Sequence, residues 1–365
     1  MIILIPAYQP DRKLIDLVSS IDAAAPGVVV LVVDDGSGPD YRSVFAAVHR
    51  RGHRVVGYDT NQGKGFALKT GFALIARDFP GQDVVCADCD GQHAVGDILR
   101  VVQRVRTGGA AMVLGTRSFT GQVPARSRFG NTMTRWLFRL STGRRIDDTQ
   151  TGLRGYPSSM LGWLGTIGGN RYEYELNILL EACQTGRAIE TEEIATIYLA
   201  ANASSHFRPL ADSVRIYAPL LKFILSSLAA FVIDAVALLV LTGITGSLLF
   251  SVIGARVLSS ATNFLINRRA VFVHGRDRPV GVAALGYFSL VIILVAVNYL
   301  SLLLLTTLQV PLLPAKVVTE VTLFVVGYAV QSRFLFAGRK AAPAAGPVES
   351  GGDVRSGESA AAGTR

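Results

Sequence analysis

Cysteine is scarce in this sequence, and so are charged side chains. The three cysteines, Cys86, Cys89 and Cys183, are too few and odd in number for a disulfide framework, which excludes a small disulfide-stabilised secreted protein and favours a reducing compartment. Charged residues make up only 17% of the chain and apolar residues 50%, so extensive disorder is excluded and membrane segments are indicated. No basic stretch follows Met1, so we expect the apolar start IILIPAY to form a first strand in the cytosol and not a signal peptide.

Acidic residues are outnumbered by basic ones, 27 to 36, which gives a net charge of +9. Such a balance suits nucleic acid, anionic lipid or a phosphorylated substrate as the partner. The basic residues follow the membrane topology described below, so we expect a lipid bilayer and no nucleic acid. A length of 365 residues corresponds to about two to three domains.

Strand-like and helix-like segments alternate from Ile2 to about Leu199. The runs IILIPAY, VVVLVVDD, RVVGYD, DVVCADCD and AAMVLGTR are near-continuous apolar strands, which is typical of a parallel sheet covered on both faces. Between them lie amphipathic segments, the first with apolar residues at 14, 17, 18 and 21. The pattern predicts an α/β domain over residues 1–203 with a mostly parallel, Rossmann-like sheet.

Four long apolar segments follow, at about 223–242, 247–266, 283–306 and 312–331. Each has about 20 residues, enough to cross the roughly 30 Å hydrocarbon core of a bilayer. Basic residues lie between the second and third segments and after the fourth, so the positive-inside rule puts the N-terminal domain, the middle loop and the tail in the cytoplasm. We predict an all-α transmembrane domain over 223–338, a disordered tail over 339–365, and no duplication between the two pairs of segments.

The segment between the two domains, residues 204–222, mixes apolar and basic side chains. We expect an interfacial helix with its cations on anionic lipid; a solvated linker helix is the alternative. Three ionisable residues, Asp234, Arg256 and Glu320, fall at membrane depth, where such groups are either functional or paired between spans for structural reasons.

The strand DVVCAD leads into a cluster of oxygen-bearing side chains. Asp88 and Asp90 are two residues apart and would point to the same side of an extended chain, and Gln92 has the same parity. Mg²⁺ or Mn²⁺ binds one or two protein carboxylates and completes its shell with water and substrate phosphates, so we predict a site for a metal ion and a diphosphate, with a polar turn as the alternative. The CxxC formed by Cys86 and Cys89 has no second pair, so zinc and redox roles are not expected.

Two further turns follow apolar strands. Asp34 and Asp35 end the strand LVVDD, at the position where open α/β sheets bind ligands, and they suit ring nitrogens and ribose hydroxyls; helix capping is the alternative. NQGKG at 61–65 opens a helix, so its glycines suit a close approach to phosphate with Lys64 beside it, and a plain turn is an equal alternative.

Arg117, Arg126 and Arg128 cluster after the strand AAMVLGTR. Arginine matches phosphate oxygens bidentately, so the cluster predicts a phosphorylated acceptor, with a solvated loop as the alternative. The segment IDDTQTGLRGYP then supplies Asp148, and NRYEYELNILLE predicts an amphipathic helix that opens with Glu173 and Glu175.

Together these motifs resemble family 2 glycosyltransferases of the polyprenyl-phosphate hexosyltransferase type. The resemblance covers residues 1–210 and rests on PAY at 6–8, DDGS at 34–37, NQGKG at 61–65, DCDGQH at 88–93, GTR at 115–117 and DTQTGLR at 148–154. It implies a GT-A fold, a catalytic set of Asp90, Arg117 and Asp148, and three binding sets: Pro6, Ala7, Tyr8, Asp34, Asp35, Lys64 and Asp88 for a nucleotide sugar; Asp88, Asp90 and Gln92 for the metal; and Arg117, Arg126, Arg128 and Arg208 for a lipid phosphate. The chain departs from the family where Gln9, Pro10 and Asp11 replace the usual Asn-Glu after Tyr8.

The apolar segments are similar to the GtrA-like membrane family, through KFILSSLAAFVIDAVALL, NFLINRRAVF and VQSRFLF. That family is associated with flipping or handling polyprenyl-linked sugars. The combined resemblance implies attack by polyprenyl phosphate on the anomeric carbon of a nucleotide-linked hexose, with inversion and with Mg²⁺ or Mn²⁺ at the diphosphate. A neutral lipid or nascent glycan as acceptor, and a lipid-linked sugar flippase with a binding-only cytosolic domain, are the alternatives; a homo-oligomer is left open.

Overall fold

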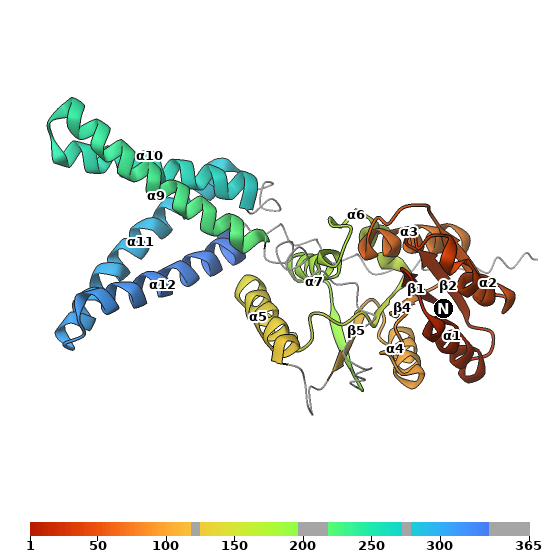
Figure 1. Ribbon diagram of the computed structural model, residues 1–365. Coiled ribbons are helices and arrows are strands. Elements are labelled where there is room, and N and C mark those ends of the chain that lie inside the picture. Colours follow the sequence, from red (N-terminus) through yellow and green to blue (C-terminus); the bar gives the residue numbers. More distant parts are fainter. Residues whose placement is uncertain (118–124, 196–217, 272–278, 336–365) are drawn as a thin grey trace, which may run out of the picture.

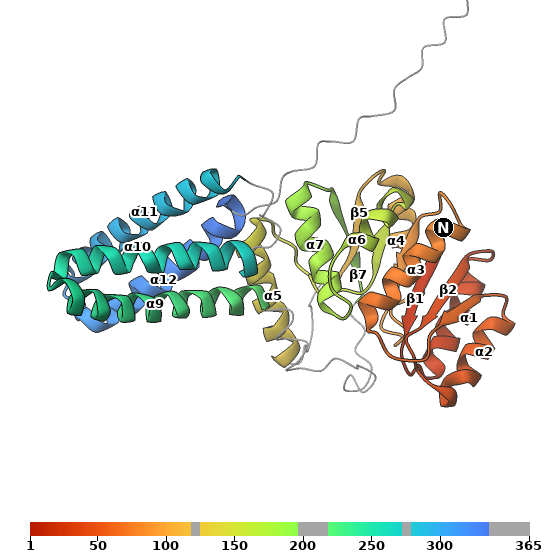
Figure 2. The same cartoon turned by 90° about the horizontal axis from the view of Figure 1, so that it is seen from above.

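The structure is a computed structural model that describes residues 1–117, 125–195, 218–271 and 279–335. An α/β domain and a bundle of four long helices lie side by side, with helix α5 (Ala125–Thr142) between them in both views (Figures 1 and 2). The predicted fold class, a GT-A domain of α/β type followed by an all-α domain, is confirmed. Most of the predicted interfacial helix, Arg208, and the tail from residue 336 lie outside the described residues.

A seven-stranded sheet forms the centre of the α/β domain, with the strand order β3-β2-β1-β4-β6-β5-β7. The described pairs are parallel except those of β6, which runs antiparallel to both β4 and β5. The strands are β1 (Ile2–Ala7), β2 (Val29–Asp34), β3 (Arg54–Gly57), β4 (Val84–Cys86), β5 (Met112–Arg117), β6 (Arg154–Tyr156) and β7 (Ile189–Ile194). The mostly parallel sheet was predicted, whereas the antiparallel β6 was not.

Helices cover both faces of this sheet, because strand side chains alternate between the faces. Ile3 and Ile5 of β1 are buried on one face against α1, α2 and α4, while Ile2 and Leu4 are buried on the other against α3, α6 and α7. The helices of the two layers are α1 (Arg12–Ala24), α2 (Arg42–Arg50), α4 (Val95–Thr107), α3 (Lys64–Asp78), α6 (Leu161–Thr166) and α7 (Glu173–Thr185). The predicted apolar stripe of α1 is confirmed, since Leu14, Leu17, Val18 and Ile21 are all buried.

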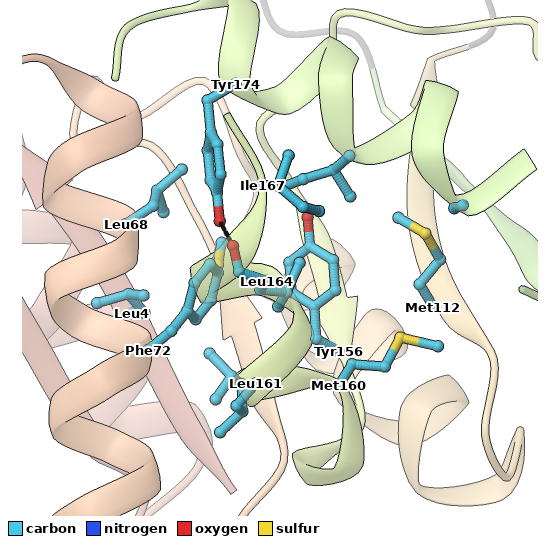
Figure 3. Packing of buried hydrophobic residues seen from close by; sticks show 14 of the residues in the cluster. Leu4, Leu68, Phe72, Met112, Tyr156, Met160, Leu161, Leu164, Ile167 and Tyr174 are labelled. Atoms are coloured by element: carbon cyan, nitrogen blue, oxygen red, sulfur yellow. Dashed lines mark hydrogen bonds between the residues drawn. The ribbon is translucent and has the colours of Figure 1, made fainter. Parts of the chain in front are cut away.

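Tyr174 of α7 anchors the core beneath the functional edge of the sheet. Its ring is buried, and its hydroxyl donates a hydrogen bond of 2.8 Å to the carbonyl oxygen of Leu164, so the polar end of the ring is satisfied (Figure 3). Phe72 and Tyr156 pack edge to face nearby, with ring centroids 5.5 Å apart. This packing fixes the start of α7, where Glu173 and Glu175 lie in the first turn as predicted.

The helical domain consists of two hairpins. The first pairs α9 (Ala218–Thr245) with α10 (Leu248–Ile266), and the second pairs α11 (Val280–Thr307) with α12 (Leu312–Val330). Within the described residues, the stretches Leu220–Thr245 and Val280–Thr307 are long and apolar enough to cross a membrane. Helices α10 and α12 coincide with the second and fourth predicted spans, and their crossing of the bilayer stays a prediction.

The two hairpins are built alike. Each consists of a helix of 28 residues, a helix of 19 residues and a π-helical turn of five, Asn267–Val271 in the first hairpin and Gln331–Leu335 in the second. The side chains of Asn267 and Gln331 meet where the hairpins join, with Nδ2 of Asn267 donating to Oε1 of Gln331 at 3.0 Å. The prediction of no duplication is therefore wrong. Most positions in both halves hold interchangeable apolar residues, so the duplication appears in lengths and polar positions and not in residue identity.

Candidate active site

The candidate site lies at the edge of the sheet where parallel strands β1, β2 and β4 end. Register pairs Ala7 with Asp34 and Leu4 with Cys86, so the segments that follow these strands emerge side by side. Ligands of open α/β sheets bind at this edge. Pro6 and Ala7 are buried in β1, so they reach the edge mainly through their backbone. Tyr8 follows them, half-buried, at the predicted donor position.

Lys64, at the start of α3, holds two carboxylates together at this edge. Its Nζ lies 2.7 Å from Oδ1 of Asp88 and 2.9 Å from Oε2 of Glu175. Burial alone would lower the pKa of Lys64, but the two carboxylates raise it above its usual value, and the ammonium remains charged. Burial alone would likewise raise the pKa of Asp88, and Lys64 with His93 lowers it below its usual range. The lysine that was predicted to face phosphate is thus bound to acids in this state.

Asp90 and Gln92 lie beside this cluster, in a turn. Strand β4 ends at Cys86, so the prediction that strand alternation orients Asp88 and Asp90 is wrong; the turn at 89–90 orients them instead. The backbone N–H of Gln92 donates to Oδ1 of Asp90 at 3.0 Å. Burial and the Asp88 carboxylate raise the pKa of Asp90, so this position favours a cation.

These residues fit a hard divalent ion. The described part of the chain has no group of three or more His, Cys, Asp or Glu residues that could enclose a metal. Two carboxylates and one amide oxygen nevertheless suit Mg²⁺ or Mn²⁺, which keep several positions for water and substrate phosphate. Asp88 is already neutralised by Lys64, so Asp90 and Gln92 would be the main protein ligands, with Asp88 beside them.

Gly152 allows a second segment to touch Asp88. A Cβ added at Gly152 would lie 2.6 Å from Cγ of Asp88, so only glycine leaves room for this carboxylate. Nε2 of His93 lies 3.4 Å from Oδ2 of Asp88 without the geometry of a hydrogen bond. Asp88 is therefore contacted by Lys64, Gly152 and His93, and its side chain stays 29% exposed.

Asp35 organises the loop at 61–63. Its carboxylate accepts hydrogen bonds from Tyr58 Oη at 2.7 Å and Asn61 Nδ2 at 2.9 Å, and from the backbone N–H groups of Gln62 at 2.8 Å and Gly63 at 3.0 Å. With only 3% of its surface exposed, Asp35 is saturated by the chain itself in this state. Its neighbour Asp34 accepts one bond from the backbone N–H of Ser37, at 2.8 Å, and is more accessible.

Gln9 is the first residue at which the chain departs from the family pattern after Tyr8. Its φ of +50° is a left-handed conformation that few residues other than glycine adopt. Its backbone N–H donates to the hydroxyl of Ser37 at 2.8 Å, which ties the end of β1 to the turn after β2. Asp11 accepts from the backbone N–H of Lys13 and caps α1.

Arg117 and Asp148 form a bidentate ion pair. Nε and Nη2 of Arg117 lie 2.6 Å and 3.1 Å from the two oxygens of Asp148, and the Asp148 side chain is fully buried. The backbone N–H of Gln150 also donates to Asp148, at 3.1 Å. Segment 148–154 thus contacts Arg117 through Asp148 and touches Asp88 through Gly152.

Helix α5 connects this segment to the membrane-domain helices. Arg126 and Arg128 lie on α5, and their side chains, like Arg208, are outside the described residues. At the other end of α5, Arg333 of the second π-helical turn donates from Nε to the carbonyl oxygen of Leu140 at 2.8 Å. The hydroxyl groups of Ser141 and Tyr328 are 3.2 Å apart at the same contact.

Several residues of the site were not predicted from the sequence. His93, Gly152 and Arg154 lay inside quoted motifs without an assigned role, and Glu175 was noted only as a helix-opening acid. A usable signal for Glu175 was its position: it precedes Ile178, Leu179 and Ala182 on the buried stripe of α7, where an unpaired acid is costly. Arg154 is buried and donates to three backbone carbonyl groups, a role that only the fold reveals.

Comparison with known proteins finds a family match for each of the two domains. Residues 2–162 match Glycosyl transferase family 2, and residues 222–336 match the family GtrA/DPMS, transmembrane domain. Over 215 residues the chain is 25% identical to UDP-N-acetylglucosamine--dolichyl-phosphate N-acetylglucosaminyltransferase of Methanococcus voltae, covering 54% of this chain and 85% of that protein. Over 210 residues it is 26% identical to polyprenol monophosphomannose synthase of Mycolicibacterium smegmatis, covering 52% and 74%.

Among solved structures, glucosyl-3-phosphoglycerate synthase from Mycobacterium tuberculosis is similar with a TM-score of 0.46 and 19% identity, over 62% of this chain and 77% of that one. The first family match covers the site residues up to 162, and the second covers most of the helical bundle. The chain is a glycosyltransferase that joins a family 2 domain of GT-A fold to a GtrA/DPMS transmembrane domain.

Proposed function

We propose that the protein transfers a hexose from a nucleotide-diphosphate sugar, of the UDP-glucose or GDP-mannose type, to a membrane polyprenyl phosphate. The observation that carries the proposal is that one short segment, residues 148–154, contacts both Asp88 and Arg117. A donor diphosphate near Asp88 and an acceptor phosphate near Arg117 would then lie on either side of the same segment. The names of both relatives include a polyprenyl-type phosphate or its sugar product, which supports this acceptor class.

On the donor side, Asp90 and Gln92 would hold Mg²⁺ or Mn²⁺, with Asp88 beside them. The ion supplies positive charge to the diphosphate that leaves the sugar. Asp34, which pairs with Ala7 at the end of β1 and so lies near Tyr8, is the accessible candidate for the nucleoside. Asp35 acts on the same site indirectly, by holding the loop at 61–63 in place.

On the acceptor side, an oxygen of polyprenyl phosphate attacks the anomeric carbon while the bond from that carbon to the diphosphate breaks. A phosphate with a second pKa near 6 is largely ionised at neutral pH, so no strong general base is needed. Asp148 is bound to Arg117 and orients its guanidinium, which agrees with this chemistry. A single displacement inverts the anomeric centre, and the product would serve cell-envelope glycan synthesis.

The membrane domain would anchor the site at the lipid surface. Arg268, Arg269 and Arg333 lie in the π-helical turns at the end of the bundle next to α5. By the positive-inside rule, this end and the glycosyltransferase domain face the cytoplasm of a multi-pass plasma-membrane protein. Handling or flipping of the lipid-linked product is a further role for these helices.

The test is transfer of radiolabelled hexose from a panel of UDP- and GDP-sugars into extractable lipid, with purified full-length protein, polyprenyl phosphate, and Mg²⁺ or Mn²⁺. Asp90→Asn should abolish labelling, and Asp16→Asn, which changes an exposed acid on α1, should leave it intact. Label in a neutral lipid or glycan would replace the acceptor assignment. Donor binding without any transfer would favour a flippase with a binding-only cytosolic domain.

A further inference from the structure

Lys64 has two carboxylate partners in different surroundings. Asp88 lies just before the turn at 89–90, and its side chain is 29% exposed. Glu175 lies in the first turn of α7, and its side chain is 10% exposed. The contacts of the two carboxylates with Nζ of Lys64 are similar in length, 2.7 Å and 2.9 Å. One ammonium group thus links a carboxylate at the edge of the site to a buried one.

Arg154 fixes Glu175 in place. Its Nη1 donates to the backbone carbonyl oxygen of Glu175 at 2.6 Å, and its Nε lies 3.9 Å from Oε1 of the Glu175 carboxylate. Arg154 is a buried residue of strand β6, and it also donates to the backbone carbonyl groups of Thr149 and Thr151. Glu175 is therefore tied both to the sheet and to the segment 148–154.

The backbone around Lys64 is fixed against the start of α7. A Cβ added to Gly65 would lie 2.5 Å from Cβ of Tyr174, so a larger residue would not fit there. The backbone N–H of Phe66 donates to the carbonyl oxygen of Asn170 at 2.9 Å, just before α7 begins. These contacts set the position of the lysine relative to α7. Its other carboxylate partner lies on a separate segment, after strand β4.

Any cation that draws on the charge of Asp88 competes with Lys64. A buried ammonium group that loses its last counter-charge is strongly destabilising. Because Glu175 lies 2.9 Å from Nζ, Lys64 can give up its contact with Asp88 and still keep an anionic partner. Without Glu175, the same exchange would take from the lysine the carboxylate that neutralises it. Glu175 thus lowers the free energy needed to release Asp88.

We propose that Glu175 is a positioning residue of the donor site, which retains Lys64 when a metal ion and the donor diphosphate draw on the charge of Asp88. The inference rests on the proposed function, since it takes Asp90 and Gln92 to hold that ion beside Asp88. Glu175 acts through Lys64 and not by contact with the ion or the sugar. Lys64 stays charged and paired with and without the donor, so donor binding replaces one contact of the lysine and leaves the other intact.

The test is a double-variant cycle on purified full-length protein. Calorimetry measures binding of the Mn²⁺ complex of UDP and, separately, of GDP. Glu175→Gln keeps the shape of the side chain and removes its charge, so Lys64 is held by Asp88 and competes more strongly with the ion. We expect the dissociation constant of the nucleotide complex to rise at least about tenfold, which corresponds to ~1.4 kcal/mol.

The second half of the cycle repeats this change without the lysine. In Lys64→Met no ammonium group competes for Asp88, so the loss caused by Glu175→Gln should be at least about threefold smaller than in the natural chain. Equal losses in the two backgrounds would show that Glu175 acts only as a negative charge at a distance. No loss in the natural chain would show that Lys64 does not compete with the ion. Either result overturns the proposal, and so does a natural chain that binds neither complex.

A matched control lies two positions away on the same helix. Glu173 accepts hydrogen bonds from the backbone N–H groups of Asn170 and Arg171, at 3.1 Å and 3.2 Å, and not from the lysine. Glu173→Gln should therefore change the dissociation constant less than about twofold. A loss as large as that of Glu175→Gln would mean that any change at the start of α7 disturbs the site, and it would contradict the proposal.

The transfer reaction separates a positioning role from a folding defect. Glu175→Gln should raise KM for the donor, while kcat at saturating donor and Mn²⁺ stays within about threefold of the natural value. A rate that stays far lower at saturation would mean a distorted site and would overturn the proposal. Binding of the nucleotide complexes needs no acceptor. A chain that passes the binding cycle but transfers no hexose to polyprenyl phosphate would therefore refute the proposed function and leave this inference standing.

Discussion

Arg333 closes the carboxyl end of helix α5. Its Nε donates to the carbonyl oxygen of Leu140 at 2.8 Å, and its Nη2 donates to that of Arg139. The last carbonyl groups of a helix have no partners within the helix and carry partial negative charge, so a guanidinium there is favourable. A residue of the membrane domain therefore completes a helix that leads into the Asp148 segment.

Removing this cap should loosen α5. For Arg333→Ala we expect hydrogen exchange at 132–142 to accelerate about tenfold, because bonds to a charged donor are worth about 1.5–3 kcal/mol. Ser141→Ala, which removes only the hydroxyl contact with Tyr328, should have a smaller effect. Unchanged exchange in Arg333→Ala would show that α5 is held by apolar packing alone.

Lys64 should be essential for the stability of the α/β domain. Lys64→Met leaves the carboxylates of Asp88 and Glu175 close together without their shared cation. Removal of one partner of a fully buried pair costs about 3–5 kcal/mol, and because Lys64 and Asp88 are partly exposed we expect a smaller loss, about 1–3 kcal/mol. Glu175→Gln keeps the pair between Lys64 and Asp88 and should cost less. Thermal unfolding of the full-length protein measures the stability of both variants. Equal melting temperatures for Lys64→Met and the natural chain would contradict the prediction.

Gly152→Ala should reduce activity more than stability. The new methyl group would displace the Asp88 carboxylate, and a shift of about 1 Å in a positioning group can cost ~100-fold in rate. Gly162→Ala is a matched control, since nothing lies within 4 Å of the added Cβ. The measurement is kcat/KM for hexose transfer beside donor binding, and full activity of Gly152→Ala would show that Asp88 needs no fixed position.

The Arg117 and Asp148 pair should govern acceptor binding. Arg117→Lys keeps the charge and loses the bidentate fork, so we expect KM for polyprenyl phosphate to rise about tenfold with a smaller change in kcat. Asp148→Asn should also raise KM for polyprenyl phosphate, because the guanidinium of Arg117 loses the carboxylate that orients it. An effect on the nucleotide sugar KM alone would move Arg117 to the donor side.

Chelation should stop transfer without unfolding the protein. Without a divalent ion, no positive charge at Asp90 and Asp88 would offset the charge of the donor diphosphate. Transfer should therefore vanish on chelation and return when Mg²⁺ or Mn²⁺ is added. Circular dichroism before and after chelation provides the control, because the ion pair of Lys64 already stabilises Asp88. Transfer that persists in excess chelator would contradict a metal-dependent donor site.

Regular periodicity made much of the fold predictable. The apolar stripe of α1 and the buried strands β1 and β2 follow directly from spacing and residue type. Strand β6 was missed because three residues between a turn and a proline give too short a pattern. The approach of Lys64 and Gly152 to Asp88 joins segments far apart in the chain, so local patterns located the residues but not their contacts. The cap on α5 by Arg333 spans two domains, and spacing carries no information about it.

The hydrogen bond between Asn267 and Gln331 joins the two hairpins of the bundle near the end that lies next to α5. Hydrogen bonds between side-chain amides are directional, and Asn267 also accepts one from the buried hydroxyl of Ser226 at 2.6 Å. These bonds hold the two hairpins in one geometry at this junction. We therefore expect the angle between the two hairpins, and not the junction itself, to adapt to bilayers of different thickness. A junction on the side of α5 would then keep the catalytic edge at a constant distance from the lipid headgroups.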